Sequence, residues 1–105
     1  MKAYKVSLTP DAISDLENIY LYIAEKSELP EVAWAYMQRL EKACYSLETV
    51  PLRGQRRDDL RKNLRIVPID KNAVAAFEVD VEKQNVTILN IFYGGQDYDT
   101  IMKNS

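Results

Sequence analysis

The sequence predicts an α+β fold with the order β-α-α-β-β-β, in which a helical hairpin packs on one face of a small, mostly antiparallel sheet. Apolar residues recur with the helical period through roughly the first half of the chain. After Leu64 the pattern changes to three runs rich in Val, Ile and Phe that are separated by polar breaks. The length of 105 residues corresponds to a single domain, which we assign to residues 1–105.

A short opening strand over residues 4–9 leads into the first predicted helix. Thr9 suits the N-cap, Pro10 the first helical position and Asp11 the positive end of the helix dipole. The helix is expected to end between residues 27 and 29, because Pro30 disfavours helical geometry in the residue before it. Its predicted core face consists of Ala12, Ile13, Leu16, Ile19, Tyr20 and Ile23.

The second helix is predicted to begin at Pro30 and to end before Pro51. The very short link between the helices predicts an antiparallel hairpin. Cys44 lies on the core side of this helix and is expected to be a small buried hydrophobe. The predicted core face consists of Ala33, Met37, Leu40, Cys44 and Leu47.

Three strands are predicted at Leu64–Ile69, Val74–Val81 and Val86–Tyr93. The last strand is apolar on both faces, which places it in the middle of the sheet. Gly94 and Gly95 end it, and residues 101–105 are expected to be loose in the unbound chain.

Composition excludes several classes of protein. With 47% hydrophobic and 29% charged residues the chain is globular, and a lone cysteine cannot form an internal disulfide. No apolar run is long enough to span a membrane, so we expect a cytoplasmic protein. The chain has no histidine, which removes the usual general base near neutral pH and the commonest metal ligand. We therefore expect no metal and no cofactor.

The segment RGQRRDDLRKNLR, residues 53–65, holds six cations and two carboxylates, while the chain as a whole carries a net charge of −2. One interpretation is a docking surface for an acidic protein or for phosphates, since arginine pairs well with both. The other is a loop whose arginines pair with nearby acids. A pI near 5.1 argues against independent nucleic-acid binding. The candidate residues are Arg53, Arg56, Arg57, Arg61 and Arg65.

Two further sets of residues are candidate contact sites. Leu21, Tyr22, Trp34 and Tyr45 are large side chains outside the predicted core faces of the helices. They are predicted to bind a partner protein or a second copy of the chain, and partial burial at the hairpin seam is the alternative.

The other set follows the last strand. Tyr93, Gln96, Asp97 and Tyr98 are expected at the rim of the sheet, where loops commonly carry contact residues. In the purely structural interpretation, the two glycines only permit unusual backbone angles and Asp97 pairs with an arginine.

Three segments together resemble the RelE/ParE superfamily of bacterial toxins, and its ParE-like branch most of all. They are LTPDAISDLENIYLYIAE, VPLRGQRRDDLRKNLRIVP and VTILNIFYGGQDYD, and the resemblance spans roughly residues 4–98. It implies the fold predicted above and a role as the toxin of a type II toxin–antitoxin pair, of the plasmid stabilisation type. The cognate antitoxin would wrap its tail around the toxin. The ParE branch implies DNA gyrase as the target, and the RelE branch implies ribosome-dependent cleavage of messenger RNA.

Departures from the RelE pattern favour binding over catalysis. Glu78 stands where an arginine is common, and Gln96 replaces a typical basic residue. A carboxylate beside a scissile phosphate would raise the transition-state charge, and only Tyr93 and Tyr98 are left as proton carriers. Together with these departures, the resemblance to the ParE branch implies a gyrase inhibitor, and we assign it no catalytic residues. A RelE-like endoribonuclease, an attenuated module that binds only its antitoxin, and a homodimer stay open.

Overall fold

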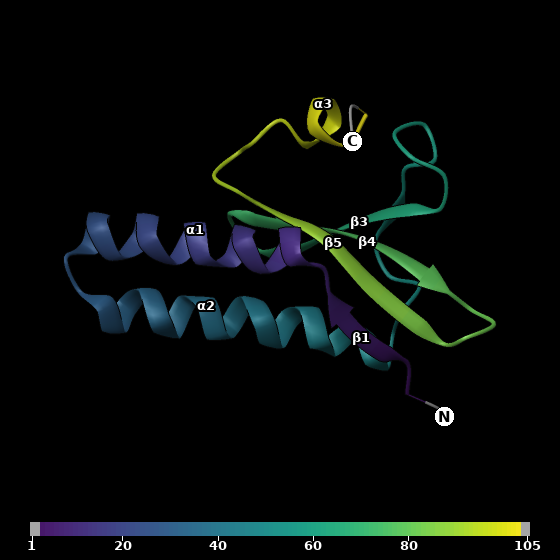
Figure 1. The fold of residues 1–105 in the computed structure, drawn as a ribbon, viewed down its shortest axis with the longest axis horizontal. Helices are drawn as coiled ribbons and strands as arrows, with labels where there is room; N and C mark the ends of the chain where they lie inside the picture. Colours follow the sequence, from purple (N-terminus) through teal and green to yellow (C-terminus); the bar gives the residue numbers. More distant parts are fainter. Residues whose placement is uncertain (1–2, 104–105) are drawn as a thin grey trace.

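A computed structural model describes residues 3–103 of the chain (Figure 1). Its helices and strands follow the predicted order with two additions, β2 and α3. The first half contains β1 (Lys5–Leu8), α1 (Pro10–Ser27), α2 (Pro30–Tyr45) and the 3₁₀ turn η1 (Ser46–Glu48). The second half contains β2 (Gln55–Arg56), β3 (Leu64–Asp70), β4 (Ala73–Asp80), β5 (Asn85–Tyr93) and α3 (Tyr98–Lys103).

The strands form one mixed sheet in the order β1-β5-β4-β3-β2. β1 pairs with β5 in parallel, and the other neighbours are antiparallel. This confirms the predicted fold class and the interior position of β5. The register between β4 and β5 shifts at Ala76/Phe77, where Asn90 and Ile88 are the successive partners and Leu89 is passed over. β1 reaches only as far as Ile88, because the chain then leaves the sheet to form α1.

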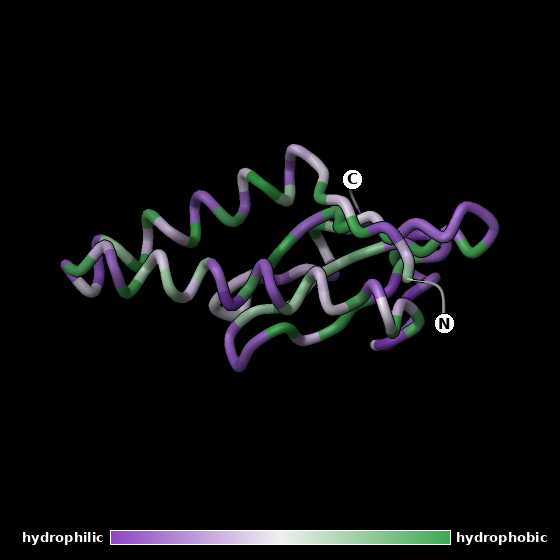
Figure 2. The backbone as a smooth tube through the Cα atoms, turned by 90° about the horizontal axis from the view of Figure 1, so that it is seen from below, coloured by the Kyte–Doolittle hydropathy of each residue, from purple (hydrophilic) through white to green (hydrophobic). Residues whose placement is uncertain are grey.

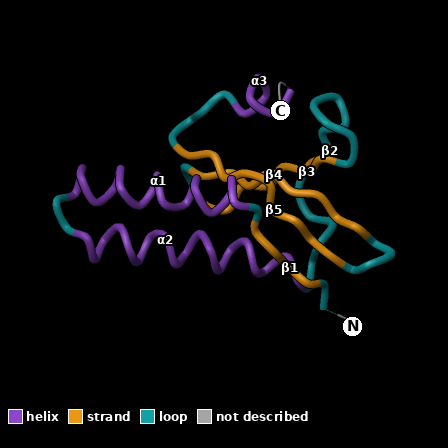
Figure 3. The backbone as a smooth tube through the Cα atoms, in the orientation of Figure 1, coloured by secondary structure: helices purple, strands orange, loops and turns teal. Residues whose placement is uncertain are grey.

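The two long helices pack side by side over one face of the sheet, and the end of the hairpin extends beyond the strands (Figures 1 and 3). The Thr9 hydroxyl accepts a hydrogen bond from the Ala12 amide at 3.1 Å, as the sequence predicts for an N-cap. Figure 2 shows hydrophobic and hydrophilic positions alternating along both helices. Their buried residues join the sheet in one cluster that includes Leu16, Leu40 and Phe77. Cys44 is fully buried as predicted, and burial raises the pKa of its thiol to about 12.

The prediction that Ile13 belongs to the core face of α1 is wrong, because 47% of Ile13 is exposed. The buried positions of this helix are Ala12, Leu16 and Ile19, which follow one narrow stripe. Ile13 lies one residue round the helix from Ala12, about 100° away, so it falls beyond the area that the sheet covers.

The second face of the sheet is covered in part by α3, which the sequence did not predict. Met102 is buried there beside Leu64, Ile66, Ala76 and Phe92. The expectation of a loose tail is therefore wrong for residues 101–103, and residues 104–105 lie outside the described part of the chain. A six-residue helix is too short to be stable by itself, so this apolar contact holds it in place.

Gly54 precedes the edge strand β2 at a position where only glycine fits. Its φ is +81°, and an added Cβ would lie 2.4 Å from the carbonyl oxygen of Ile66. Gly95 has nearly the same φ, +80°, but apart from its own chain neighbours no described atom lies within 4 Å of its added Cβ. Substituting each glycine in turn therefore distinguishes the free-energy cost of the backbone angle from that of the close approach to β3.

We expect Gly95→Ala to lower the free energy of unfolding by about 1–2 kcal/mol, the cost of a left-handed conformation with a side chain. Gly54→Ala should cost at least about 3 kcal/mol, because the backbone of β3 must also move. Urea unfolding of both variants measures the difference. Equal losses in the two variants would contradict a close approach between Gly54 and β3.

Candidate functional site

Two of the five arginines of residues 53–65 pair with acids from the same segment. Arg56 binds Asp58 with two hydrogen bonds of 3.0 and 3.1 Å. Arg57 binds Asp59 at 2.9 Å and also reaches Asp99 of α3 at 3.3 Å. These pairs lower the pKa of Asp58 and Asp59 and raise the pKa of Arg57. Arg57 thus connects the loop to the C-terminal helix.

The remaining arginines differ in their partners. Arg61 forms an ion pair with Glu78 of β4 at 3.2 Å, and Arg65 donates to the carbonyl oxygen of Leu52 at 3.2 Å. Arg53 makes no ion pair with any residue described by the structure. Local pairing, the second of the two interpretations, accounts for the geometry of most of this loop. Its role in docking stays a prediction.

The four residues predicted at the sheet rim are divided between two places. Tyr93 faces the helices, whereas Tyr98 begins α3 and packs its ring 5.9 Å from that of Phe92. Asp97 accepts hydrogen bonds from the Thr100 hydroxyl and amide, which lower its pKa. The suggestion that Asp97 pairs with an arginine is wrong; Asp99 does so instead, because Asp97 caps the helix.

The four exposed helix residues do not form one surface. Leu21 and Trp34 line a shallow recess on one side of the hairpin, together with parts of both helices. Tyr22 lies on another side, where its ring packs edge-on against Tyr93 at 5.8 Å. Tyr45 ends α2 and does not line the recess. All four are at least 47% exposed, as the sequence predicts, and their role in partner binding stays a prediction.

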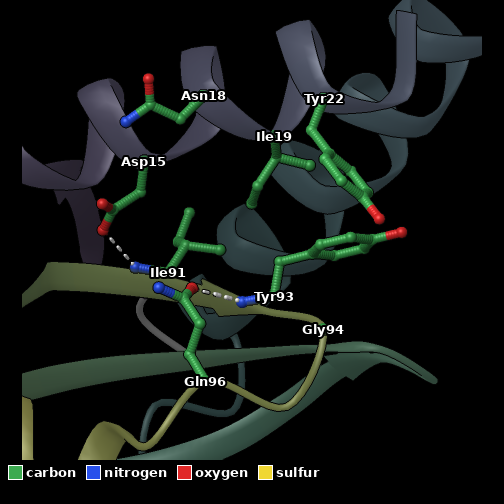
Figure 4. A pocket seen from close by; sticks show the side chains of 8 residues that line it. All are labelled: Asp15, Asn18, Ile19, Tyr22, Ile91, Tyr93, Gly94 and Gln96. Carbon is green, nitrogen blue, oxygen red and sulfur yellow. Dashed lines mark hydrogen bonds between the residues drawn. The ribbon is translucent and has the colours of Figure 1, made fainter. Parts of the chain in front are cut away.

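A cleft of about 360 Å³ lies between α1 and the end of β5 (Figure 4). Here β5 has passed the end of β1, and side chains take the place of a neighbouring strand. Asp15 accepts a hydrogen bond from the Ile91 amide at 2.8 Å, and Gln96 accepts one from the Tyr93 amide at 2.9 Å. Burial raises the pKa of Asp15 despite these contacts. The cleft therefore sits on a sheet edge that polar side chains cap.

Tyr93 also joins this cleft to a larger groove under the projecting end of the hairpin. The Tyr36 ring packs edge-on against Tyr93 at 5.8 Å, and its hydroxyl donates to Asp70 at 2.6 Å. That hydrogen bond lowers the pKa of Asp70, while burial raises the pKa of Tyr36. The guanidinium of Arg39 lies 5.0 Å from the Tyr36 ring centre. Together these contacts form a fixed cluster of tyrosines between the helices and the sheet.

Asp15 and Tyr36 were missed as site residues in the sequence. The only signal for Asp15 is a carboxylate next to the apolar stripe of α1, between Ala12 and Leu16. Tyr36 precedes the predicted core residue Met37 and has no local feature that points to Asp70.

The described residues contain neither a candidate metal site nor a membrane-spanning helix. No group of three or more His, Cys, Asp or Glu side chains among them could hold a metal ion. None of the helices in residues 3–103 has the length and hydropathy needed to cross a membrane.

A family model described as "ParE toxin of type II toxin-antitoxin system, parDE" matches residues 6–98 of the chain. The chain belongs to this family. The match confirms the predicted resemblance and identifies this ParE-family chain as the toxin of a type II toxin–antitoxin system. It ends at Tyr98, where α3 begins. No curated protein matches the chain.

Solved structures confirm the fold. A chain of the "Chromosomal ParDE TA system from P. aeruginosa" is similar, with 23% identity and a TM-score of 0.70 over 87% of this chain and 96% of that one. A chain of the toxin–antitoxin complex RelBE2 from Mycobacterium tuberculosis has 19% identity and a TM-score of 0.60 over 87% and 98%. The ParE-family toxin thus shares its architecture with structures from both branches of the superfamily.

We expect Asp15→Ala to lower the free energy of unfolding by about 1–3 kcal/mol, because it leaves the Ile91 amide without its acceptor. Asp15→Asn keeps an acceptor oxygen and should cost less. Because its pKa is raised, the contribution of Asp15 to stability falls as pH rises from the ordinary value of 3.8 through the pKa of the folded state, where the folded state binds more protons than the unfolded state.

The asparagine variant has no titrating group at position 15. Its stability relative to wild type should therefore increase as pH rises from 3.8 through the pKa of Asp15 in the folded state. Urea unfolding of the three proteins at a series of pH values measures the trend. A relative stability of Asp15→Asn that falls with pH would contradict a raised pKa at Asp15.

Proposed function

We propose that this ParE-family toxin inhibits DNA gyrase by binding it, and that a cognate antitoxin neutralises it by covering its surface. Membership of the ParE family is the reason for proposing gyrase as the target. The similar P. aeruginosa chain is part of a chromosomal ParDE toxin–antitoxin system, which supports an antitoxin partner for this chain by analogy.

The main support for a binding mechanism is the position of the two candidate proton carriers, Tyr93 and Tyr98. Tyr93 lies in the cluster on the helix side of the sheet, and Tyr98 lies in the cluster beneath α3. A general acid and a general base must reach the same reacting group within hydrogen-bond distance. Tyrosines on opposite faces of a sheet cannot serve one phosphodiester, which disfavours a RelE-like reaction.

The charges on β4 and its neighbouring loop support the same mechanism. Glu78 holds Arg61 in an ion pair, so this arginine is not directed at a substrate phosphate. Arg57 is likewise shared between Asp59 and Asp99. Stabilising a phosphoryl transition state needs cations that are aimed at the developing charge. Cations already paired with carboxylates supply less of that stabilisation.

Expression of the chain without its antitoxin in a bacterial host tests the proposal. We expect growth arrest with altered plasmid supercoiling and intact messenger RNA, and rescue when the product of the adjoining gene is co-expressed. Arrest with normal supercoiling and fragmented messages would instead identify a ribonuclease. Continued growth at a verified protein level would identify an attenuated module.

Tyr93→Phe and Tyr98→Phe separate binding from cleavage more directly. Each removes one hydroxyl and keeps the ring, so a protein that binds should retain growth arrest with at most a modest loss of affinity. Loss of all arrest in either variant, with the protein folded by circular dichroism, would contradict the binding mechanism. Wild type expressed to the same level is the reference.

A further inference from the structure

We propose that a recess on the outer side of the helical hairpin, here called the tryptophan recess, binds a positively charged surface of the target protein and receives one of its apolar side chains. The inference rests on the proposed function and names the part of the toxin that contacts the target. The residues that define the tryptophan recess are Glu17, Tyr20, Leu21, Trp34 and Met37.

The tryptophan recess lies on the side of the hairpin that is turned away from the sheet. Leu21 comes nine residues after the buried Ala12, which places it half a turn round α1 at about 100° per residue. Trp34 lies about 120° round α2 from the buried Leu40. Because the two helices pack side by side (Figure 1), both side chains line one recess. It is separate from the cleft and the groove that contain Tyr93.

The recess offers an apolar contact of the size of a side chain. Leu21 is 62% exposed and Trp34 is 53% exposed, and none of the ring contacts among residues 3–103 involves Trp34. The recess has a volume of about 250 Å³, below the roughly 300–1,000 Å³ of a typical small-molecule site. It therefore suits one anchoring side chain of a protein, and tryptophan is among the residues that contribute most at protein interfaces.

The charges around the recess identify the class of partner. On the same helix, the positions three, four or seven residues from Leu21 and Trp34 include four glutamates and no lysine or arginine. None of these glutamates forms an ion pair within the described range 3–103. An apolar recess among unpaired carboxylates complements a positively charged surface. The glutamates are Glu17, Glu25, Glu31 and Glu41.

The proposed target, DNA gyrase, is expected to carry such a surface. A protein that binds DNA contacts the phosphates with lysine and arginine, so its surface near the DNA is basic. A second copy of the toxin fits less well, because a two-fold contact between the recesses would bring the glutamates of both copies together. The same negative charge repels nucleic acid. The occupant that fits both the apolar recess and its charges is a basic protein surface.

Truncation of the two exposed side chains tests the apolar contact. The double variant Leu21→Ala/Trp34→Ala should raise the Kd for purified DNA gyrase about 30-fold, because it removes the anchor of the interface. The matched control is Val50→Ala/Val81→Ala, which truncates two exposed apolar residues outside the hairpin. Surface plasmon resonance measures both Kd values, and thermal unfolding checks that each variant is folded.

A charge reversal tests the electrostatic part and still decides the question if the truncated variant fails to fold. Glu17→Lys/Glu25→Lys should raise the same Kd about 10-fold or more at low salt and less at high salt, because salt screens exposed charges. The control Glu48→Lys/Glu82→Lys makes the same change in net charge at exposed positions outside α1 and α2. Equal Kd values in the two reversals would contradict a basic partner surface.

Each other outcome has a defined meaning. A truncated variant that binds gyrase as tightly as its control, while wild type inhibits supercoiling, would overturn this inference and leave the proposed function intact. No binding of gyrase by wild type would remove the proposed target and this inference with it. The proposal is also wrong if the recess variants bind gyrase normally but lose the product of the adjoining gene or dissociate a dimer of the chain. The recess would then belong to the antitoxin or to a second copy.

Discussion

Burial of β4 and β5 on both faces is the constraint on which the remaining structure depends. Phe77 and Ile88 meet the helices on one face, and Ala76 and Phe92 meet α3 on the other. Ala73, Ala75 and Ala76 are almost completely buried, and such small side chains leave room for the layers on either side. A larger polar side chain at these positions would displace a helix or leave an unpaired group in the core. Packing thus explains why alanines occupy the middle of this sheet.

The same arrangement leaves part of one sheet edge without a neighbouring strand. β1 ends at Leu8, so on that side the last part of β5 has no neighbouring strand, and Asp15 and Gln96 accept hydrogen bonds from its amides instead. The two helices continue past this point, and their residues, with Tyr93, line the larger groove. The arginines near residue 57 form ion pairs with carboxylates of the loop, of β4 and of α3. Lys26 and Arg39 occupy exposed positions on the two helices, where Arg39 pairs with Asp70 at 3.7 Å.

Sequence patterns predicted the parts of the fold whose signal is local. Thr9, Pro10 and Pro30 set the helix starts, and the long apolar runs set the strands. β2 and α3 have two and six residues, too few to show a period, and both form only because tertiary contacts hold them. Exposure of Trp34 was predictable from helix geometry. The contact of Tyr22 with Tyr93 and the pairing of Arg61 with Glu78 were not, since each joins distant segments with no local mark of its partner.

The central claim is that this toxin works by occupying another macromolecule. Its most direct test is a supercoiling assay with purified DNA gyrase, relaxed plasmid and increasing amounts of the chain, run beside ribosomes programmed with a defined message. The account predicts that supercoiling is inhibited near stoichiometric toxin, that the antitoxin restores it, and that the message stays whole. Unaffected supercoiling together with catalytic cleavage of the message would contradict it.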